Sequence, residues 1–566
     1  MNKQILKNSR EDFILKYTAA HKAKLTREQL SKILGILPKS LLKKKSEIYR
    51  EIGIELPTLS SDRNSLLDNH IIEKYESVLN DLASNILKIE RVNDVRSKTQ
   101  FNINKNKRYV ITSAQNNTPI NDEFLKSLKT YCEHNEAKLM VIPFRYRNPT
   151  SIWSQVDQQQ DFWHKSVSGY LIDSEIKVGK HVRIMGNIKI QPTATSPLSG
   201  FDSITGLDSA IFGHPNIEWK TLPAVPGKLP KIMLTTGAVT VPNYTDSKAG
   251  HKGAYHHNYA AIVLEIDDNE IFHVRHLIAD EKNGFFDLDR YYVGNKVSVG
   301  HRALALVAGD IHSEMVDDVA LNNIFIADDS IANVINPSNI ILHDILDFGA
   351  RSHWNIRDAL GRYRRHLYSD NNNVEEALQK VADLVERITR DDAQNWVIRS
   401  NHDEHIERWL READPDIDPE NAKFFHYLKY HQYKAIYEGK KFDVLKFWCQ
   451  NPDEYRGMSE EAFVRTNFLS RNESVEIGGY ELALHGDIGP NGSRGSLRNL
   501  SKIGQKIIIG HSHTPGIING SYQVGTTSKL QMDYNLGPSS WLHTCAVLYS
   551  NGTVTLVNII GGKWRL

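Results

Sequence analysis

The chain has 566 residues, of which 40% are apolar and 24% are charged, a balance typical of folded globular proteins. Its net charge of +1 gives no bulk attraction to an acidic partner, and it has no apolar run of transmembrane length and no N-terminal signal core. We therefore expect no membrane partner. Cys132, Cys449 and Cys545 lie far apart and form no CxxC pair, which predicts a reducing compartment such as the cytoplasm and excludes a thiolate metal cluster built on paired cysteines.

Residues 1–100 are predicted to form a helical, basic region. The first 56 residues contain 13 Lys and Arg against 6 Asp and Glu. Thr26 and Gln29 have the spacing of a capping box at a helix N-terminus, and a second helix is expected from about Ser40. Two helices joined by a short Gly-containing turn, the second of them rich in Lys, have the outline of a helix-turn-helix.

The basic second helix has two interpretations. A helix-turn-helix would contact DNA through it, and the candidate residues are Lys43, Lys44, Lys45 and Arg50. The alternative is a helical hairpin whose basic face is simply solvated, because this pattern is short and common.

Residues 101–298 are interpreted as an α/β accessory domain. The runs KRYVITSAQ and AKLMVIPF are typical of buried strands, and NDEFLKSLKTYCEHN between them is typical of a helix. Together they predict a βαβ unit, but there is no GxGxxG motif, so no dinucleotide site is predicted. Residues 180–298 favour further strands separated by Gly and Pro turns.

From residue 303 onward, five apolar runs each end in side chains of the kind that bind metals. The runs reach Asp310 and His312, Asp344 and Asp347, Asn401 with His402 and Asp403, His485 and Asp487, and finally His511 and His513. Each ending alone is weak evidence for a metal site, since two histidines in a surface loop are an ordinary finding. Five endings in succession indicate ligands gathered at the carboxyl ends of strands.

The chemistry of these side chains is consistent. Oxygen and nitrogen donors from Asp, Asn and His suit borderline divalent ions such as Mn²⁺, Fe²⁺ or Zn²⁺. The donors are numerous enough for two ions, and a carboxylate can bridge them through its two oxygens. A pair of ions can activate water at neutral pH and offset the charge that develops on a phosphoryl group.

The order D-x-H, D, N-H-D, H and G-H-x-H resembles the calcineurin-like metallophosphoesterase superfamily. The resemblance implies an α+β fold for residues 299–566, an αββα sandwich in which two facing sheets are covered by helices. For a first ion it implies the ligands Asp310, His312 and His513. For a second ion it implies the ligands Asn401, His485 and His511. It also implies that Asp344 bridges the two ions, with Asp347 as the alternative.

The resemblance further implies two catalytic residues. His402 matches a histidine of the superfamily that binds no ion and assists departure of the leaving oxygen. Asp403 would orient the His402 imidazole through a hydrogen bond.

Two motifs depart from the pattern of the superfamily. His343 and Phe348 replace a glycine and a phosphate-binding arginine in the second motif, and Ser400 replaces a glycine in the third. These departures argue against a protein phosphatase and favour the nuclease branch of the superfamily. Residues 404–475 are predicted to be a helical insertion over the site, serving as a cap, a substrate channel or a contact between copies.

Three functions compete at this point. A DNA nuclease explains the basic N-terminal region, whereas a small-molecule or nucleotide phosphoesterase would not need it. A DNA-binding protein built on an inactive scaffold would not need the complete ligand set. The layout of the whole chain resembles the pre-early, host-DNA-degrading deoxyribonucleases of T-five-type coliphages, which implies a Mn²⁺- or Mg²⁺-dependent enzyme acting on DNA in the infected bacterial cytoplasm. The sequence is also compatible with assembly of the chain into a homo-oligomer.

Overall fold

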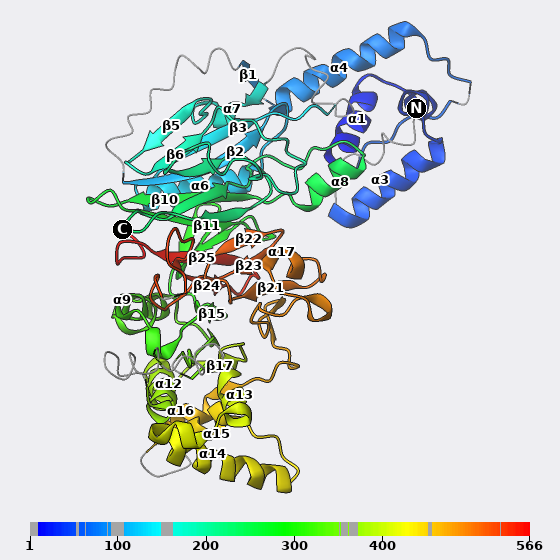
Figure 1. The fold of residues 1–566 in the computed structure, drawn as a ribbon. Helices are drawn as coiled ribbons and strands as arrows, with labels where there is room; N and C mark the ends of the chain where they lie inside the picture. The colour runs from blue at the N-terminus through cyan, green and yellow to red at the C-terminus, as the bar shows by residue number, and fades with distance from the viewer. Residues whose placement is uncertain are drawn as a thin grey trace.

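The computed structural model shows a mixed α+β protein, as expected (Figure 1). It describes residues 10–52, 56–62, 64–87, 89–91, 107–148, 162–349, 351–352, 360, 372–450, 456–532 and 534–566. Figure 1 shows an elongated molecule with sheets in the middle, the N-terminal helices beside them at one end and helices α12–α16 at the other. Within the described ranges, no helix is long and apolar enough to cross a membrane.

The first four helices pack around an apolar core of their own. They are α1 (Arg10–Lys22), α2 (Arg27–Leu34), α3 (Pro38–Ile52) and α4 (Asn69–Leu87). The Gln29 backbone N–H donates to Thr26 Oγ1, and the Thr26 N–H donates to the Gln29 side chain, so the predicted capping box is confirmed. Gly35 ends α2 at a φ of 65°, which glycine adopts without steric cost. The core of this unit includes Tyr17, Leu30, Leu41, Ile48 and Tyr75.

A four-stranded sheet with the order β11-β10-β2-β3 contains the predicted βαβ unit. Its elements are β2 (Arg108–Gln115), α6 (Asp122–His134), β3 (Lys138–Phe144), β10 (Ala260–Ile266) and β11 (Phe272–Ile278). β2 and β3 are parallel, which confirms the βαβ prediction, and β10 pairs antiparallel with both β2 and β11. Nearly every residue of β2 and β10 is buried, including the polar Thr112 and Ser113 and the charged Glu265, so neither strand shows the alternation of a half-buried strand.

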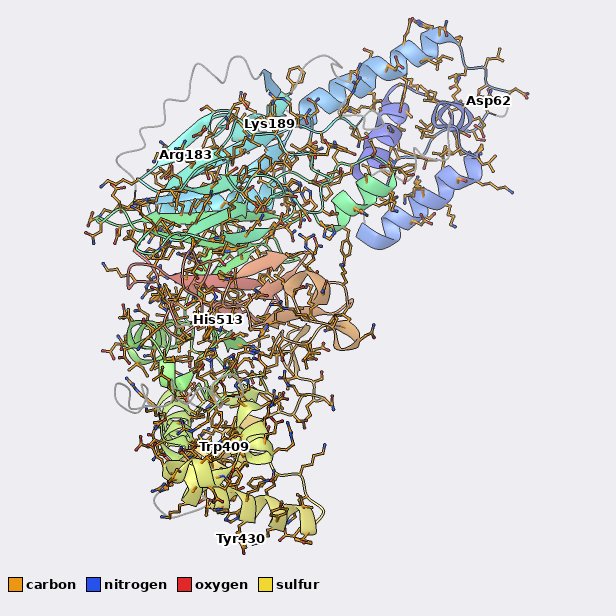
Figure 2. All side chains as sticks on the ribbon, in the orientation of Figure 1. Asp62, Arg183, Lys189, Trp409, Tyr430 and His513 are labelled. Carbon is orange, nitrogen blue, oxygen red and sulfur yellow. The ribbon has the colours of Figure 1, made fainter. Side chains whose placement is uncertain are left out.

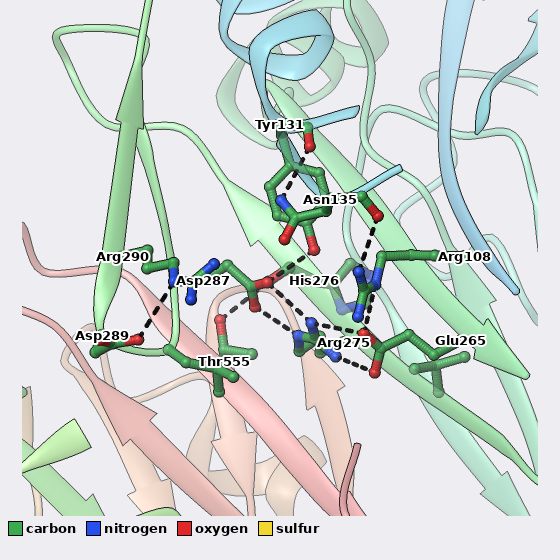
Figure 3. Close-up of polar contacts among 12 residues, drawn as sticks. Arg108, Tyr131, Asn135, Glu265, Arg275, His276, Asp287, Asp289, Arg290 and Thr555 are labelled. Carbon is green, nitrogen blue, oxygen red and sulfur yellow. Dashed lines mark hydrogen bonds and ion pairs between the residues drawn. The ribbon is translucent and has the colours of Figure 1, made fainter. Parts of the chain in front are cut away.

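A buried network of charged side chains ties this sheet to its neighbours (Figure 3). The Arg275 guanidinium lies between two carboxylates: its Nη1 is 2.9 Å from Glu265 Oε2 and its Nε is 2.5 Å from Asp287 Oδ1. The Tyr131 hydroxyl donates to Asp287 at 2.8 Å, and Arg108 Nε donates to Glu265 at 2.7 Å. Each charge therefore has an opposite charge beside it, which offsets much of the cost of removing these groups from water.

A ten-stranded sheet runs in the order β19-β20-β21-β23-β22-β8-β9-β7-β6-β5. Its strands are β5 (Glu175–Val178), β6 (Val182–Met185), β7 (Ser209–Phe212), β8 (Trp219–Leu222), β9 (Lys231–Thr235), β19 (Glu476–Ile477), β20 (Tyr480–Glu481), β21 (Lys506–Ile509), β22 (Gly516–Ile518) and β23 (Ser521–Gln523). β22 pairs with β8, so the sheet combines strands from both sides of the predicted domain boundary at 298/299. The domain limits 1–100, 101–298 and 299–566 themselves stay predictions.

A six-stranded sheet with the order β18-β17-β16-β15-β24-β25 faces the other sheets. Its strands are β15 (Ala305–Val307), β16 (Asn339–His343), β17 (Gln394–Ile398), β18 (Thr466–Phe468), β24 (His543–Leu548) and β25 (Val554–Ile559). Because side chains alternate along a strand, Ala305 and Val307 pack toward the other sheets, whereas Leu306 packs toward helices on the outer face.

Helices cover that outer face. α12 (Val374–Ile388) buries its apolar stripe there, as its periodicity predicts. Between β17 and β18 lie α13 (His405–Glu412), α14 (Pro419–Tyr437), α15 (Val444–Cys449) and α16 (Glu460–Val464). These helices fall within the stretch 404–475 for which an insertion was predicted.

Short elements complete the described part of the chain. A two-stranded sheet pairs β1 (Ile89–Arg91) with β4 (Phe162–His164), and a three-stranded sheet contains β12 (Phe285–Asp287), β13 (Arg290–Val293) and β14 (Lys296–Ser298). The short helices are α7 (Lys165–Ser168), α8 (Lys248–Tyr255), α9 (Asp318–Leu321), α10 (Ile331–Ile335) and α17 (Leu497–Leu500), with single turns η3 (Ser313–Met315), η4 (Asn322–Ile326), η5 (Pro415–Ile417) and η6 (Pro490–Gly492).

Candidate metal centre

The predicted ligands follow strands whose carboxyl ends meet at one edge of the sheets. β15, β16 and β17 are parallel neighbours, so the loops after them lie side by side. Asp310 follows β15, Asp344 follows β16 and Asn401 follows β17. In the facing sheet β20 and β21 are also parallel, and His485 and His511 follow them. Parallel pairing therefore gathers side chains that lie far apart in the sequence.

Four predicted ligands form one compact cluster. The His513 Nε2 lies 3.1 Å from Asp310 Oδ2 and 3.1 Å from the His312 Nε2, which in turn lies 3.3 Å from Asp344 Oδ2. One ligand atom from each of these four residues lies within 4.8 Å of the other three. Two carboxylates and two imidazoles that converge in this way can hold a divalent cation.

The second predicted ligand set lies around His485. Its Nε2 is 3.7 Å from Asp344 Oδ2, and its ring centroid is 5.2 Å from that of His511. Asn401 contributes a buried Oδ1 atom. Asp344 thus lies between His312 and His485 in the chain of contacts, as a shared carboxylate would. A second ion held by Asn401, His485 and His511 stays a prediction.

The cluster is buried, yet several of its oxygen and nitrogen atoms lack hydrogen-bond partners. Asp310 is 0% exposed and Asp344 is 1% exposed. Within the described residues, Asp310 Oδ1, Asp344 Oδ1 and both His485 nitrogens have no hydrogen-bond partner, whereas Asp310 Oδ2 contacts only His513. Burying carboxylates and imidazoles in this state is costly, because their lost contacts with water are not replaced. A cation shared by these atoms would replace those contacts, so the residues fit a divalent metal.

The backbone at the ligands is strained. His312, Asp344, His511 and His513 all adopt positive φ, at 48°, 52°, 74° and 57°. For a residue with a Cβ, this conformation costs about 1–2 kcal/mol, with Asp tolerating it better than His. Such residues persist where the surrounding structure fixes them, as when the His312 N–H donates to the Asp344 carbonyl at 2.7 Å. Strain concentrated on predicted ligands indicates a functional site.

Gly510 shows why the G-H-x-H motif begins with glycine. A Cβ at this position would overlap Asp310 Oδ1 and press against the His343 side chain. The missing side chain therefore lets the Asp310 carboxylate pass directly over the backbone that leads to His511 and His513.

The electrostatics of Asp344 and His513 favour the forms that bind metals, whereas burial lowers the pKa of His312 but Asp344 and Asp347 raise it above its usual value. Burial raises the pKa of Asp344, but the neighbouring charges of His402 and His312 outweigh it and hold that pKa well below its usual range. Burial lowers the pKa of His513, and the adjacent Asp310 offsets this only in part. At neutral pH the carboxylate is ionised and His513 is neutral, which are the states in which these side chains coordinate ions.

His402 lies against the cluster and is oriented by Asp347. Its Nδ1–H donates to the Asp347 carbonyl at 3.1 Å and lies 3.4 Å from Asp347 Oδ1, which also contacts the His312 Nδ1 at 3.1 Å. Burial lowers the pKa of His402, but Asp344 and Asp347 raise it to about 10. Asp347 thus positions two imidazoles, while Asp344 occupies the ligand cluster.

The hydrogen bond expected from Asp403 to His402 is absent from the described residues. The Asp403 carboxylate accepts the backbone N–H groups of Leu346 and Ser400 instead, each at 3.1 Å. It therefore joins the loop after β16 to the loop after β17. The orienting role belongs to Asp347, which the sequence motif offered only as an alternative metal bridge.

Comparison with known proteins relates the chain to a phage protein. Protein A1 of Escherichia phage T5 is 33% identical over 477 residues, which cover 82% of this chain and 84% of that protein. The chain belongs to the Protein A1 family. The expected resemblance to a phage protein is confirmed at this level. No protein-family model matches the chain, and no solved structure does either.

For this member of the Protein A1 family, the proposed DNA-contacting residues lie on α3 and differ in their surroundings. Lys43 is exposed, and Lys44 lies 3.8 Å from Glu47. Lys45 Nζ donates to the Pro57 carbonyl at 3.1 Å, which ties α3 to the following segment. The Arg50 side chain lies outside the described residues. The structure therefore leaves Lys43 free for a partner and gives Lys45 an internal role.

Three further residues of this Protein A1 relative surround the cluster without having been predicted to act there. The carboxylate of the half-buried Glu314 accepts the N–H groups of Asp347 and Phe348. Arg471 contacts Asp487 at 2.7 Å and Glu404 at 2.8 Å. Trp541 packs on His513, with ring centroids 4.0 Å apart. Glu314 carried a recognisable signal in the sequence, as a charge two residues after His312, whereas Arg471 and Trp541 lie more than ten residues from the nearest predicted ligand.

Proposed function

We propose that the chain is a metal-dependent DNA nuclease of the calcineurin-like metallophosphoesterase superfamily. It would hydrolyse phosphodiester bonds with two divalent ions, Mn²⁺ being the first candidate and Mg²⁺, Fe²⁺ or Zn²⁺ the alternatives. The observation that carries the proposal is the buried cluster of Asp310, His312, Asp344 and His513 with its unpartnered oxygen and nitrogen atoms. Two facing sheets, with helices over the outer face of one, support the αββα sandwich.

Each residue of the site has a distinct part in this proposal. Asp310, His312, Asp344 and His513 would hold one ion, and Asn401, His485 and His511 would hold the second. Bound divalent ions supply an activated water and compensate the charge of the phosphate. His402, whose Nδ1–H donates to the Asp347 carbonyl, keeps a proton at neutral pH and would donate from Nε2 to the departing sugar oxygen.

The relationship to a phage protein supports the biological setting. A phage nuclease without sequence-specific recognition would degrade host DNA in the bacterial cytoplasm, which is the role that we propose. The basic face of α3, with Lys43 exposed, would supply additional contacts to DNA phosphates.

Cleavage of DNA by the purified full-length protein tests the function. Linear and closed-circular double-stranded DNA are incubated with Mn²⁺, with Mg²⁺ and with EDTA, and bis-p-nitrophenyl phosphate is assayed in parallel. We expect cleavage only with a divalent ion. The Asp310→Asn and His402→Gln variants should lose on the order of 10²–10³-fold in rate, because the first removes a charged ligand of the ion and the second removes the proton donor to the leaving oxygen.

Asp318→Asn is the matched control, since Asp318 is exposed and lies outside the cluster. Its activity should equal that of the wild type. Hydrolysis of the small ester without any cleavage of DNA would instead assign the site to a small-molecule phosphoesterase. Wild-type activity in Asp310→Asn would refute the site itself.

A further inference from the structure

Two aromatic side chains extend from the candidate metal centre to the surface. The Trp541 ring packs edge-on against the His513 imidazole, with centroids 4.0 Å apart and planes inclined by 63°. The Tyr534 ring packs on Trp541 in the same manner, with centroids 5.7 Å apart. Figure 2 labels His513 in the middle of the molecule, between the sheets and the helical end. His513, Trp541 and Tyr534 thus form a continuous row of rings that begins at a predicted ligand.

The outer end of this row is open to solvent yet close to the cluster. Tyr534 is 60% exposed, so most of its surface is accessible to a ligand from solvent. Trp541 is half-buried. The pKa of Tyr534 is raised above its usual range. Partial burial of the phenol is the largest cause, and the negative charges of Asp347, Asp344 and Asp310 add to it, so the hydroxyl lies within electrostatic range of these carboxylates.

The loop that carries both rings is tied to the site at each end. At its start the Lys529 N–H donates to the Met315 carbonyl at 2.9 Å, shortly after the ligand His312. At its end the Leu542 N–H donates to the His513 carbonyl at 3.2 Å. Both ends of the loop are therefore anchored to the segments that carry His312 and His513, and such anchoring lowers the entropic cost of binding a ligand there.

We propose that Tyr534 and Trp541 form a stacking platform for an unpaired nucleobase next to the phosphate that binds at the cluster. The inference rests on the proposed function and narrows its substrate. Aromatic rings beside a phosphate site suit nucleotides, because every base offers a π-face whatever its sequence. A base inside a duplex is already stacked on its neighbours, so the platform selects single-stranded DNA or the unpaired end of a duplex.

Fluorescence of a single-stranded oligonucleotide containing 2-aminopurine tests the platform without catalysis. Binding to the full-length protein in EDTA should quench the 2-aminopurine, since stacking on an aromatic ring quenches this base. Tyr534→Ala and Trp541→Ala should bind about 5- to 100-fold more weakly, in line with the loss of one stacked base, and should lose the quenching. Tyr534→Phe keeps the ring and should retain both.

Tyr430→Ala is the matched control, because Tyr430 is exposed to a similar extent, 64%, but lies on α14 at the far end of the molecule (Figure 2). It should bind and quench as the wild type does. Thermal melting of each variant separates loss of stacking from loss of folding. Wild-type quenching in both alanine variants, or none in the wild type, would overturn the platform.

A cleavage assay separates this proposal from the proposed function. With Mn²⁺, the alanine variants should raise KM for a single-stranded oligonucleotide and leave kcat little changed. An oligonucleotide with an abasic residue at the platform position should be cut equally by the variants and the wild type. If the alanine variants cut DNA as the wild type does, the platform alone is refuted. If the wild type quenches 2-aminopurine but shows no metal-dependent cleavage, the nuclease proposal alone is refuted.

Discussion

Two buried clusters of charged side chains in this protein differ in how completely they are paired. Around Arg275, the guanidinium, two carboxylates, a tyrosine hydroxyl and a second arginine contact one another at 2.5–2.9 Å (Figure 3). Around Asp344, carboxylates and imidazoles converge just as closely, but Asp310, Asp344 and His485 keep atoms without hydrogen-bond partners in the described residues. Both clusters are almost fully buried.

The difference separates a structural network from a binding site. A closed network satisfies its own charges, so we expect its removal to act mainly on stability. An open cluster is stabilised only when something else supplies the missing contacts, and oxygen and nitrogen donors of this kind call for a cation. The positive φ of His312, Asp344 and His513 supports the same distinction, because strain is tolerated where function requires it.

The largest effect on stability is expected from opening the closed network. Arg275→Met leaves Glu265 and Asp287 buried beside each other without the guanidinium, and should reduce the free energy of unfolding by about 3–5 kcal/mol. Urea denaturation measures this loss. The control is Arg290→Met, because Arg290 is 44% exposed and its pair with Asp289 is 3.9 Å long, so it should cost less than about 1 kcal/mol. Equal losses in both variants would contradict a structural role for the network.

The pH dependence of stability probes the same network. Burial raises the pKa of Glu265, but Arg275 and Arg108 lower it to about 2, below the usual value of 4.5. A lowered folded-state pKa contributes stability above pH 4.5 and loses it as the pH falls toward 2. The advantage of the wild type over Glu265→Gln, on the order of 3 kcal/mol at neutral pH, should therefore shrink across that range. A pH-independent difference would show that packing, not charge, is lost.

Removing a carboxylate from the open cluster should abolish the response to metal. In the wild type, Mn²⁺ at 100 times its Kd should raise the free energy of unfolding by about 2.7 kcal/mol, and EDTA should reverse this gain. Asp310→Asn should show no such gain. Thermal melting with and without Mn²⁺ is the measurement, and Arg275→Met is an instructive comparison, since it should be less stable yet keep the Mn²⁺-induced shift. A Mn²⁺ shift retained by Asp310→Asn would place the ion elsewhere.

The sequence predicted the open cluster better than the closed one. The ligands stand directly after apolar strands, so local periodicity and motif order were enough to place Asp310, Asp344 and His513 together. The βαβ unit and the Thr26 capping box were predictable for the same local reason. The Arg275 network was not, because its partners come from separate strands and a helix whose pairing no local pattern records. The pairing of β22 with β8 across residue 298 escaped prediction on the same ground.

The role of Asp403 shows a finer limit. Its position beside His402 in the sequence favoured a hydrogen bond between them, but the turn after β17 directs the Asp403 carboxylate to two backbone N–H groups. Asp347 reaches His402 instead, from a different loop. Adjacency in the sequence did not determine which side chains meet, because the direction of a side chain in a turn depends on backbone angles.

A smaller effect is expected from crowding the open cluster without removing a ligand. Gly510→Ala introduces a Cβ that would overlap Asp310 Oδ1, so the carboxylate has to move away from His513. We expect a loss of about 10- to 100-fold in Mn²⁺ affinity, the size seen when ligand orientation is disturbed. Isothermal titration with Mn²⁺ measures it. Gly169→Ala is the matched control, because a Cβ there would meet nothing within 4 Å and its φ of −70° suits any residue. Unchanged affinity in Gly510→Ala would contradict the close approach.

The smallest effects extend the comparison to two lysines of α3, one paired and one free. Lys45 donates to the Pro57 carbonyl, whereas Lys43 is exposed and makes no ion pair within the described residues. Lys45→Ala should lower stability by about 1 kcal/mol or less and leave DNA binding unchanged. Lys43→Ala should leave stability unchanged but make the dependence of log affinity on log salt shallower by about 1, because each phosphate contact releases roughly one counterion. Fluorescence anisotropy with duplex DNA across a salt series measures this slope. If Lys43→Ala keeps the wild-type slope, the helical unit has a solvated basic face, and contact with DNA depends on the catalytic region alone.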